Sequence, residues 1–275
     1  MNDSDLSNDQ KVAFDRTTHG QFYEYYKKQS ESEGSRQRFE GMQILALDSL
    51  RMLHGTQERA LQVADIGCGA GTQSILWASR GHKVYGIDVN ESLIELAIER
   101  TRALGLEAEY RVATATALPW ADRSMDVCLV PELLEHVVEW GECLNEVVRV
   151  LAPGGVLVLT TNNKLCPIQY EFNLPLYSWY PARLKRHYER LATTVKPELA
   201  NYAKYPAVNW FTYYSLADEL TRRGLTPIHR FEAFDTRILG WPKRMVVRLL
   251  RASAALRFLY QMITPYTVIV AARPS

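Results

Sequence analysis

A glycine-rich turn between two periodic segments limits the folds that this chain can adopt. The apolar run from Leu61 to Ile66 reads as a buried strand, and the turn follows as Gly67-Cys68-Gly69-Ala70-Gly71-Thr72. Residues 73–80 then show helical spacing. A strand, a glycine turn and a helix in this order are typical of a mononucleotide-binding unit. The segment therefore predicts the start of an open parallel sheet.

Apolar strand and helix patterns continue to alternate along much of the chain. Further strands are predicted at 83–87, 109–112, 125–130, 156–160, 228–234 and 266–271, and helices at 36–53, 73–80, 91–104, 133–151, 215–223 and 243–263. Alternation at this spacing calls for helices on both faces of one sheet. We expect an α/β fold with a doubly wound, seven-stranded and mostly parallel sheet of the Rossmann-like type.

Composition changes divide the chain into four predicted parts. Residues 1–35 form a polar N-terminal arm with an aromatic anchor, and residues 36–162 form the cofactor-binding core. Residues 163–212 hold five prolines and ten aromatic residues, so they are too apolar for a linker and too irregular for the sheet. We predict that they form an inserted substrate cap. Residues 213–275 then complete the sheet and include a basic amphipathic helix.

Length and composition exclude several classes of protein. With 275 residues, of which 47% are hydrophobic, the chain can bury a substantial core. The four cysteines form no CxxC pair, and the acidic beginning of the chain lacks the pattern of a signal peptide. The longest charge-free apolar stretch, residues 258–272, is 15 residues long and contains Pro265, which is too short for a membrane span. A cytoplasmic protein is the expectation.

The residues around the glycine turn indicate the cofactor. Asp65 ends the first strand, where a carboxylate can accept a hydrogen bond from an ammonium group, and the three glycines of the turn let the backbone approach a ligand. Asp88 ends the next strand, where it can bind both hydroxyls of a ribose. A cationic amino-acid head and an unphosphorylated ribose are combined in S-adenosylmethionine. The alternative is a glycine turn that serves chain reversal alone.

Four further motifs resemble those of class I S-adenosylmethionine-dependent methyltransferases, and they follow in the same order. Residues 117–126, ALPWADRSMD, resemble the LPF-x-D-x-SFD segment, and residues 132–137, ELLEHV, resemble E-x-LEHV. Residues 149–155, RVLAPGG, resemble RVLxPGG, and a late strand follows. The likeness covers roughly residues 60–162 and is weaker near the C-terminus. The ubiquinone-biosynthesis type of small-molecule methyltransferase is most similar in its motifs.

This resemblance implies a set of cofactor contacts. They are Asp65, Gly67, Gly69, Gly71, Asp88, Val89, Thr114, Ala115 and Pro131. Thr114 departs from the family, which usually places an acidic residue there to hold the adenine amino group. Its hydroxyl can still accept a hydrogen bond. Trp120 either stacks near the adenine or is an aromatic residue of the core.

The ELLEH segment carries the predicted catalytic residues, His136 and Glu132. If a helix begins at Leu133, then Glu132, Glu135 and His136 converge on one face. His136 could take a proton from a hydroxyl group of the acceptor. The resemblance to ubiquinone-pathway enzymes also allows a divalent cation at this face, since two carboxylates and an imidazole are suitable ligands. A purely structural role is the third alternative, and the metal ligands are left unassigned.

The last part of the chain is basic. Residues 61–160 carry 7 Lys and Arg against 14 Asp and Glu, whereas residues 161–275 carry 17 against 7. On the predicted helix 243–263, Arg244, Arg248 and Arg251 share one side, beside an apolar stripe. Such a helix fits peripheral contact with an anionic membrane at its inner face. The alternative is an apolar stripe packed on the fold with a solvated basic face.

These expectations lead to a function. We expect methyl transfer from S-adenosylmethionine to a small acceptor, most simply to a hydroxyl of an aromatic, quinone-type or lipid-linked molecule. The alternatives are a non-catalytic cofactor-binding scaffold, or an N- or C-methyltransferase acting on a natural product or a glycan. No nucleic-acid partner is expected, because PELL stands after the fourth strand where RNA methyltransferases place a base-holding Asn-Pro-Pro-Tyr motif. The sequence leaves the acceptor and the oligomeric state open.

Overall fold

The computed structural model describes residues 32–55, 59–203, 205–233, 236 and 240–275. The aromatic anchor predicted for the N-terminal arm lies outside these residues. The strands are β1 (Gln62–Ile66), β2 (Lys83–Asp88), β3 (Glu109–Val112), β4 (Met125–Pro131), β5 (Leu151–Asn162), β6 (Thr226–Ile228) and β7 (Tyr266–Ala272). The α-helices are α2 (Glu33–His54), α3 (Thr72–Ala78), α4 (Glu91–Ala103), α5 (Trp140–Val150), α6 (Ala182–Thr194), α7 (Tyr213–Arg222), α8 (Arg230–Ala233), α9 (Trp241–Ala252) and α10 (Ala254–Ile263). Two short 3₁₀ helices are η2 (Tyr177–Trp179) and η3 (Pro197–Ala200).

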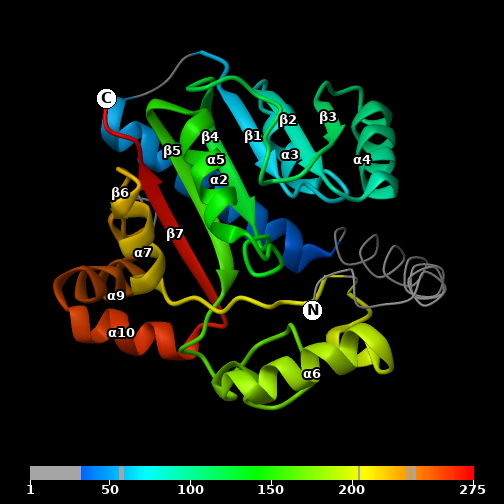
Figure 1. The fold of residues 1–275 in the computed structure, drawn as a ribbon. Coiled ribbons are helices and arrows are strands. Elements are labelled where there is room, and N and C mark those ends of the chain that lie inside the picture. Colours follow the sequence, from blue (N-terminus) through cyan, green and yellow to red (C-terminus); the bar gives the residue numbers. More distant parts are fainter. Residues whose placement is uncertain (1–31, 56–58, 204, 234–235, 237–239) are drawn as a thin grey trace.

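The seven strands form one sheet in the order β3-β2-β1-β4-β5-β7-β6 (Figure 1). Strands β1 to β5 pair in parallel, and β7 is antiparallel to both of its neighbours, β5 and β6. This confirms the predicted mostly parallel sheet. The strand order reverses between β1 and β4, and in open α/β sheets a crevice forms at that point, outside the carboxyl ends of the strands.

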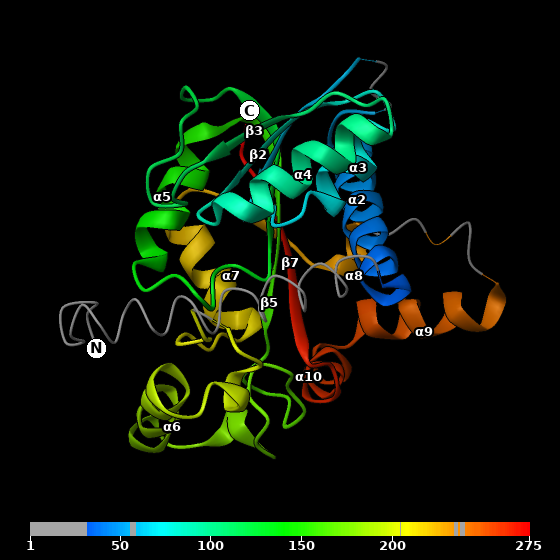
Figure 2. The same ribbon diagram turned by 90° about the vertical axis from the view of Figure 1, so that its right-hand side faces the viewer.

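Helices cover both faces of the sheet (Figure 2). On one face, Leu45 and Leu50 of α2 pack with Trp77 of α3 against alternate residues of the central strands. On the other face, Leu144 of α5 and Leu216 of α7 pack against the remaining residues. Strands β1, β4 and β5 are buried almost throughout because both of their faces are covered.

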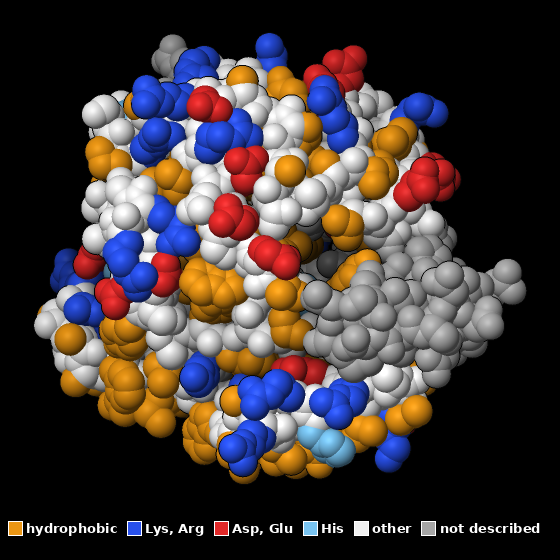
Figure 3. All heavy atoms as spheres, viewed as in Figure 1, with side chains coloured by type: hydrophobic (Ala, Val, Ile, Leu, Met, Phe, Trp, Pro, Cys, Tyr) orange, Lys and Arg blue, Asp and Glu red, His pale blue; other side chains and the backbone are white. Residues whose placement is uncertain are grey.

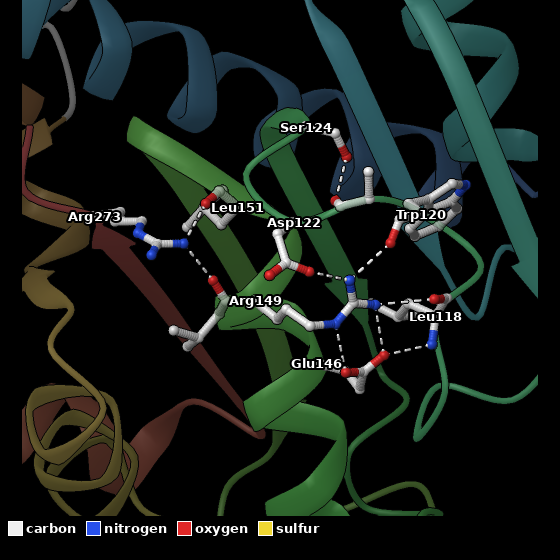
Figure 4. A network of polar contacts seen from close by, with 10 residues as sticks. Leu118, Trp120, Asp122, Ser124, Glu146, Arg149, Leu151 and Arg273 are labelled. Atoms are coloured by element: carbon white, nitrogen blue, oxygen red, sulfur yellow. Dashed lines mark hydrogen bonds and ion pairs between the residues drawn. The ribbon is translucent and has the colours of Figure 1, made fainter.

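Arg149, at the end of α5, explains one of the sequence motifs (Figure 4). Its guanidinium donates to the backbone oxygens of Leu118 and Trp120, at 3.0 and 2.8 Å, and pairs with Asp122 at 2.8 Å. It also pairs with Glu146 at 2.7 Å, which holds the pKa of that carboxyl below its usual range. Arg149 therefore fixes the segment before β4 to α5. Trp120 packs partly buried against the core, which is the structural one of its two predicted roles.

Residues 163–212 leave the sheet after β5 and lie beyond the carboxyl ends of the parallel strands (Figure 1). Their aromatic side chains pack against one another. The rings of Phe172 and Tyr177 stack 4.1 Å apart, and Tyr177 also meets Trp210 edge to face. Lys185 is buried beside them, with Nζ 3.9 Å from the centre of a Trp210 ring, and burial lowers its pKa to about 8. The division of the chain into domains stays a prediction.

The strand predicted at 228–234 is wrong beyond Ile228. Strand β6 ends there, and α8 follows because the chain turns at His229, whose carbonyl oxygen accepts a hydrogen bond from the Glu232 amide at 2.7 Å. The predicted run of apolar residues therefore does not extend the edge of the sheet.

The single helix predicted at 243–263 is two helices, α9 and α10. Ser253 between them has an extended backbone (φ −127°, ψ 114°), and its Oγ accepts a hydrogen bond from the Leu256 amide at 3.3 Å. A serine in this role caps the start of a helix, so Ser253 ends α9 and begins α10. Among the residues that the structure describes, none of the helices is both long and apolar enough to pass through a membrane.

Candidate active site

The glycine turn lies at the carboxyl end of β1, at the point where the strand order reverses. Gly67 and Gly71 have φ of 77° and 76°, a conformation that favours glycine. A Cβ at Gly71 would lie 2.8 Å from the Cβ of Ala97 in α4, and one at Gly67 would lie 3.0 Å from Leu133. Only glycine therefore allows α4 and the loop after β4 to pack this closely on the turn.

Asp65 lies beneath this turn and is completely buried. One carboxylate oxygen accepts a hydrogen bond from Ser74 Oγ at 2.6 Å, and the other has no hydrogen-bond partner among the described residues. The pKa of Asp65 is raised to about 7. Burial raises it most, the Ser74 hydrogen bond opposes that rise, and the nearby Asp88 carboxylate adds to it. The unpartnered oxygen is suited to a cationic donor.

The raised pKa of Asp65 predicts a dependence of stability on pH. Because the folded state holds the proton more tightly than the unfolded chain, the free energy of unfolding should fall as the pH rises from about 4 to about 7. Asp65→Asn removes this penalty, so its stability relative to the natural protein should rise by roughly 2–4 kcal/mol over that range. Urea unfolding at both ends of the range measures this. If the stabilities of the variant and of the natural protein changed with pH in the same way, the prediction would be contradicted. Glu95→Gln, at an exposed position of α4, is the control.

Asp88 ends β2 and holds the glycine turn from the other side. Its two carboxylate oxygens accept hydrogen bonds from the Gly69 and Asn90 amides, each at 2.9 Å. Each oxygen keeps a second lone pair for another donor. Burial raises its pKa, and the backbone bonds oppose that rise. Val89 next to it is 56% exposed.

Thr114 and Ala115 follow β3 and lie outside the main cavity lining. The Thr114 side chain is exposed, and its hydroxyl lies 2.9 Å from that of Thr116. Ala115 is buried in the core beneath. The structure thus keeps a hydroxyl, and no carboxylate, at the position where the family usually has an acid.

A cavity of about 490 Å³ opens beside the glycine turn. The turn lines one wall through Gly67 and neighbouring residues, and Pro131, Glu132 and His136 after β4 line another. The remaining wall comes from Arg38 of α2, Tyr170 and Glu171 of the 163–212 segment, and Tyr266 of β7. Of the predicted site residues, the cavity brings together Gly67, Pro131, Glu132 and His136. Its lining does not include Asp65, Gly69, Gly71, Asp88, Val89, Thr114 or Ala115.

The segment 132–139 is not helical, so the prediction that a helix begins at Leu133 is wrong. Helix α5 begins at Trp140. Asn209 Nδ2 donates to the carbonyl oxygens of Leu134 and Val137, at 3.1 and 2.7 Å, and the carbonyl of Glu135 accepts from the Val208 and Asn209 amides. These acceptors are therefore bound by a distant segment instead of by a following helical turn. Glu132 itself has a φ of 48°, a strained conformation often found at functional sites.

The loop gives the three polar side chains of ELLEH three different partners. Glu135 is fully buried, and one of its carboxylate oxygens accepts a hydrogen bond from Thr161 Oγ1 at 2.8 Å. Glu132 pairs with Arg38 at 2.8 Å. His136 faces Glu171, with 3.9 Å between Nε2 and Oε2. Glu132 and His136 line the same cavity, but Glu135 is buried away from its lining, so the three do not share a helix face as expected.

This arrangement does not fit a divalent cation. Across the described residues, no three His, Cys, Asp or Glu side chains are grouped as ligands of one ion. Glu135 accepts a hydrogen bond from Thr161 of β5, and Glu132 is paired with the Arg38 guanidinium, so both carboxylates already have other partners.

The electrostatics of the cavity depend on Glu132, Glu171 and Arg38. The pKa of Glu132 is raised to about 7. Burial raises it most, the Arg38 guanidinium opposes that rise, and the Glu171 carboxylate adds to it. The same guanidinium lies 5.4 Å from the centre of the Tyr266 ring, and Tyr170 stacks on Tyr266 at 6.0 Å. His136 Nδ1 is buried and has no hydrogen-bond partner within the part of the chain that is described.

Sequence reasoning missed Arg38, Tyr170, Glu171 and Tyr266. They come from three separate places in the chain, with Tyr170 and Glu171 adjacent, so no local spacing joins the three. One signal was present, because Glu171 is one of only seven acidic residues in the basic part from 161 to 275.

Part of the chain is similar to proteins of known family. Residues 64–159 match the family model described as a methyltransferase domain. The chain is similar to the ubiquinone biosynthesis O-methyltransferases of Caulobacter sp. (strain K31), at 38% identity over 40% of this chain and 44% of the relative, and of Rhizobium johnstonii, at 33% over 50% and 55%. It thus spans about half the length of the curated relatives it matches.

Solved structures share the fold. A S-adenosylmethionine-dependent methyltransferase from Methanosarcina mazei is 24% identical, with 81% of this chain and 97% of that chain covered and a TM-score of 0.50. The cyclase SpnF is 18% identical, with 83% and 80% covered and a TM-score of 0.51. The strand order and the glycine turn agree with the family match, which gives residues 64–159 as a methyltransferase domain.

Proposed function

We propose that this protein transfers a methyl group from S-adenosylmethionine to a hydroxyl oxygen of a small aromatic acceptor bound in the cavity. The observation that carries the proposal is the meeting of the glycine turn with His136 in one cavity, where the imidazole faces Glu171. A cavity of about 490 Å³ is within the size range of small-molecule sites. The name of the curated relatives, O-methyltransferase, supports oxygen as the methylated atom.

The residues around the turn fit the cofactor. The unpartnered buried oxygen of Asp65 and the close backbone approach at Gly67, Gly69 and Gly71 form an acidic cradle for a cationic group. Asp88 holds the turn and keeps lone pairs for ribose hydroxyls. The resemblance assigns Val89, Thr114 and Ala115 to the adenine side, where Val89 and Thr114 are exposed and Ala115 is buried. Pro131 stands where this cradle meets the cavity. When bound, S-adenosylmethionine supplies an electrophilic methyl group.

The chain's own residues prepare the acceptor. His136 Nε2 takes the proton of the hydroxyl as the oxygen attacks, and the Glu171 carboxylate stabilises the resulting imidazolium. Tyr170 and Tyr266 provide a flat wall against which an aromatic ring can lie. Glu132 and Arg38 neutralise each other at the rim, so the hydroxyl meets no unpaired charge there. Most of the rate gain then comes from positioning in a site that excludes water.

An acceptor assay tests the proposal. The full chain is incubated with methyl-labelled S-adenosylmethionine and, in separate reactions, catechol, an alkyl-substituted catechol and aniline. We expect label in the catechols, with the alkyl-substituted one preferred, and little in aniline. Binding of S-adenosylhomocysteine without transfer to any hydroxyl probe would support a non-catalytic scaffold instead, and preferred labelling of aniline would support nitrogen as the acceptor atom.

A further inference from the structure

The two helices α9 and α10 are held to the fold by few side chains. Only Leu250 of α9 and Gln261 of α10 are buried. Eight large apolar side chains are exposed instead: Trp241, Met245, Val246, Leu249, Leu256, Phe258, Leu259 and Ile263. Figure 3 shows hydrophobic side chains gathered at the lower left, over these helices. Contiguous exposed apolar surface of this kind marks an interaction site. We call these residues the α9–α10 surface.

The exposed apolar residues follow the helical repeat. Trp241, Met245 and Leu249 are four residues apart and share one face of α9, at 76%, 46% and 52% exposure. On α10, Leu259 and Ile263 are likewise four residues apart, at 55% and 72% exposure. Each helix therefore turns an apolar stripe towards solvent, whereas a helix packed on the sheet would bury it.

The charged side chains of the two helices that carry the α9–α10 surface are all basic. Residues 241–263 contain five Lys and Arg and no Asp or Glu. Two of the arginines hold the helices in place, because Arg251 Nε donates to the Phe231 carbonyl at 2.6 Å and Arg257 Nη1 donates to the Leu250 carbonyl at 3.1 Å. Lys243 and Arg248 are exposed and supply positive charge beside the apolar stripes.

The surface adjoins the cavity. Helix α10 ends at Ile263, and Tyr266, three residues later, lines the cavity wall. Helix α6 lies at the same end of the molecule (Figure 1), with exposed Arg183, Arg186 and Arg190 spaced three and four residues apart. Positive charge and exposed apolar side chains thus meet at the end of the fold that holds the site.

We propose that the α9–α10 surface docks on an anionic lipid bilayer, with its apolar side chains in the interface and its basic residues against the headgroups. Two copies of this chain would bring the same positive charges together without an acid on this surface to offset them. A bilayer with anionic headgroups supplies both the apolar phase and the opposite charge. Docking in this orientation brings the cavity close to the membrane, where a lipophilic acceptor would be concentrated.

Vesicle flotation with the full chain tests this proposal. Vesicles of phosphatidylglycerol and phosphatidylcholine are compared with phosphatidylcholine alone, at low and high salt. The natural protein should float with the anionic vesicles, and high salt should weaken this because the Debye length shortens to about 3 Å at 1 M. Lys243→Glu with Arg248→Glu should weaken binding at least about tenfold, since each basic residue near the surface contributes to the attraction.

Two further variants test whether the position of the charge and the apolar side chains both matter. Arg80→Glu with Lys83→Glu makes the same change in net charge at the start of β2, which lies in the other half of the sheet from β7, and should float like the natural protein. Leu249→Ser with Leu259→Ser keeps the charge, removes exposed apolar side chains and should also weaken binding. Circular dichroism confirms that each variant is folded.

Several outcomes would overturn the proposal. The first is the absence of flotation by the natural protein at low salt, and the second is equal flotation with neutral and anionic vesicles. The third is a loss of binding in the Arg80 and Lys83 variant as large as that in the Lys243 and Arg248 variant. Self-association that Leu249→Ser with Leu259→Ser abolishes, without vesicle binding, would make the surface an interface between copies of this chain. None of these readouts requires methyl transfer, so their failure is distinguishable from failure of the proposed function.

Discussion

Replacing His136 with alanine should lower turnover with a catechol acceptor by about 10² to 10⁴-fold while cofactor binding stays nearly unchanged. The loss is large because the side chain that takes the hydroxyl proton disappears, whereas the hydrogen bond between Asp88 and the Gly69 amide that holds the turn does not involve His136. Steady-state rates, together with titration of S-adenosylhomocysteine, measure both effects.

A change at Glu171 tests the same proposal independently. Glu171→Gln keeps the size of the side chain but removes the charge that faces His136 Nε2. As a positioning residue, its change should lower turnover less than His136→Ala does. His187→Ala, on exposed α6, is the matched control and should behave like the natural protein. Natural turnover for His136→Ala would make the residue structural.

Replacing Asp88 with alanine should raise the dissociation constant for S-adenosylhomocysteine by about ten- to a hundredfold. Hydrogen bonds to a charged group contribute about 1.5–3 kcal/mol, and this carboxylate is the one placed for the ribose. Asp88 also accepts hydrogen bonds from the Gly69 and Asn90 amides, so thermal unfolding must show that the variant is folded. Isothermal calorimetry gives the constant.

The control for this change is Glu95→Ala, which removes an exposed carboxylate from the neighbouring helix α4. It should bind as the natural protein does, which would show that the loss is not a general effect of net charge. A folded Asp88→Ala variant with an unchanged constant would remove Asp88 from the site.

The sheet could be predicted from sequence because its signals are local. Runs such as residues 62–66 and 156–160 are covered on both faces and are therefore mostly apolar, and the glycines of the turn are required by close packing against Ala97 and Leu133. Arg149 belongs to the RVLAPGG motif that the sequence shows. Its structural role follows only from its hydrogen bonds to the carbonyl oxygens of Leu118 and Trp120. The break at Ser253 was present in the sequence as a capping residue and was missed.

The cavity could not be predicted in the same way because distant segments build it. Residues 132–139 have the composition of a helix, yet Asn209, more than seventy positions away, binds their carbonyl oxygens and keeps them in a loop. Arg38 and Glu171 have no special spacing, and only the fold brings them to Glu132 and His136. The similarity to SpnF, a cyclase, also shows that the fold alone does not decide the reaction.

The atom that receives the methyl group tests the central claim most directly. With S-adenosylmethionine carrying carbon-13 in its methyl group and an alkyl-substituted catechol as acceptor, the carbon spectrum of the product distinguishes methyl groups on oxygen, nitrogen and carbon. We predict a single oxygen-bound methyl signal that grows with the natural protein and is nearly absent with His136→Ala. A carbon-bound methyl signal, or an oxygen-bound signal that His136→Ala leaves unchanged, would contradict hydroxyl methylation assisted by this histidine.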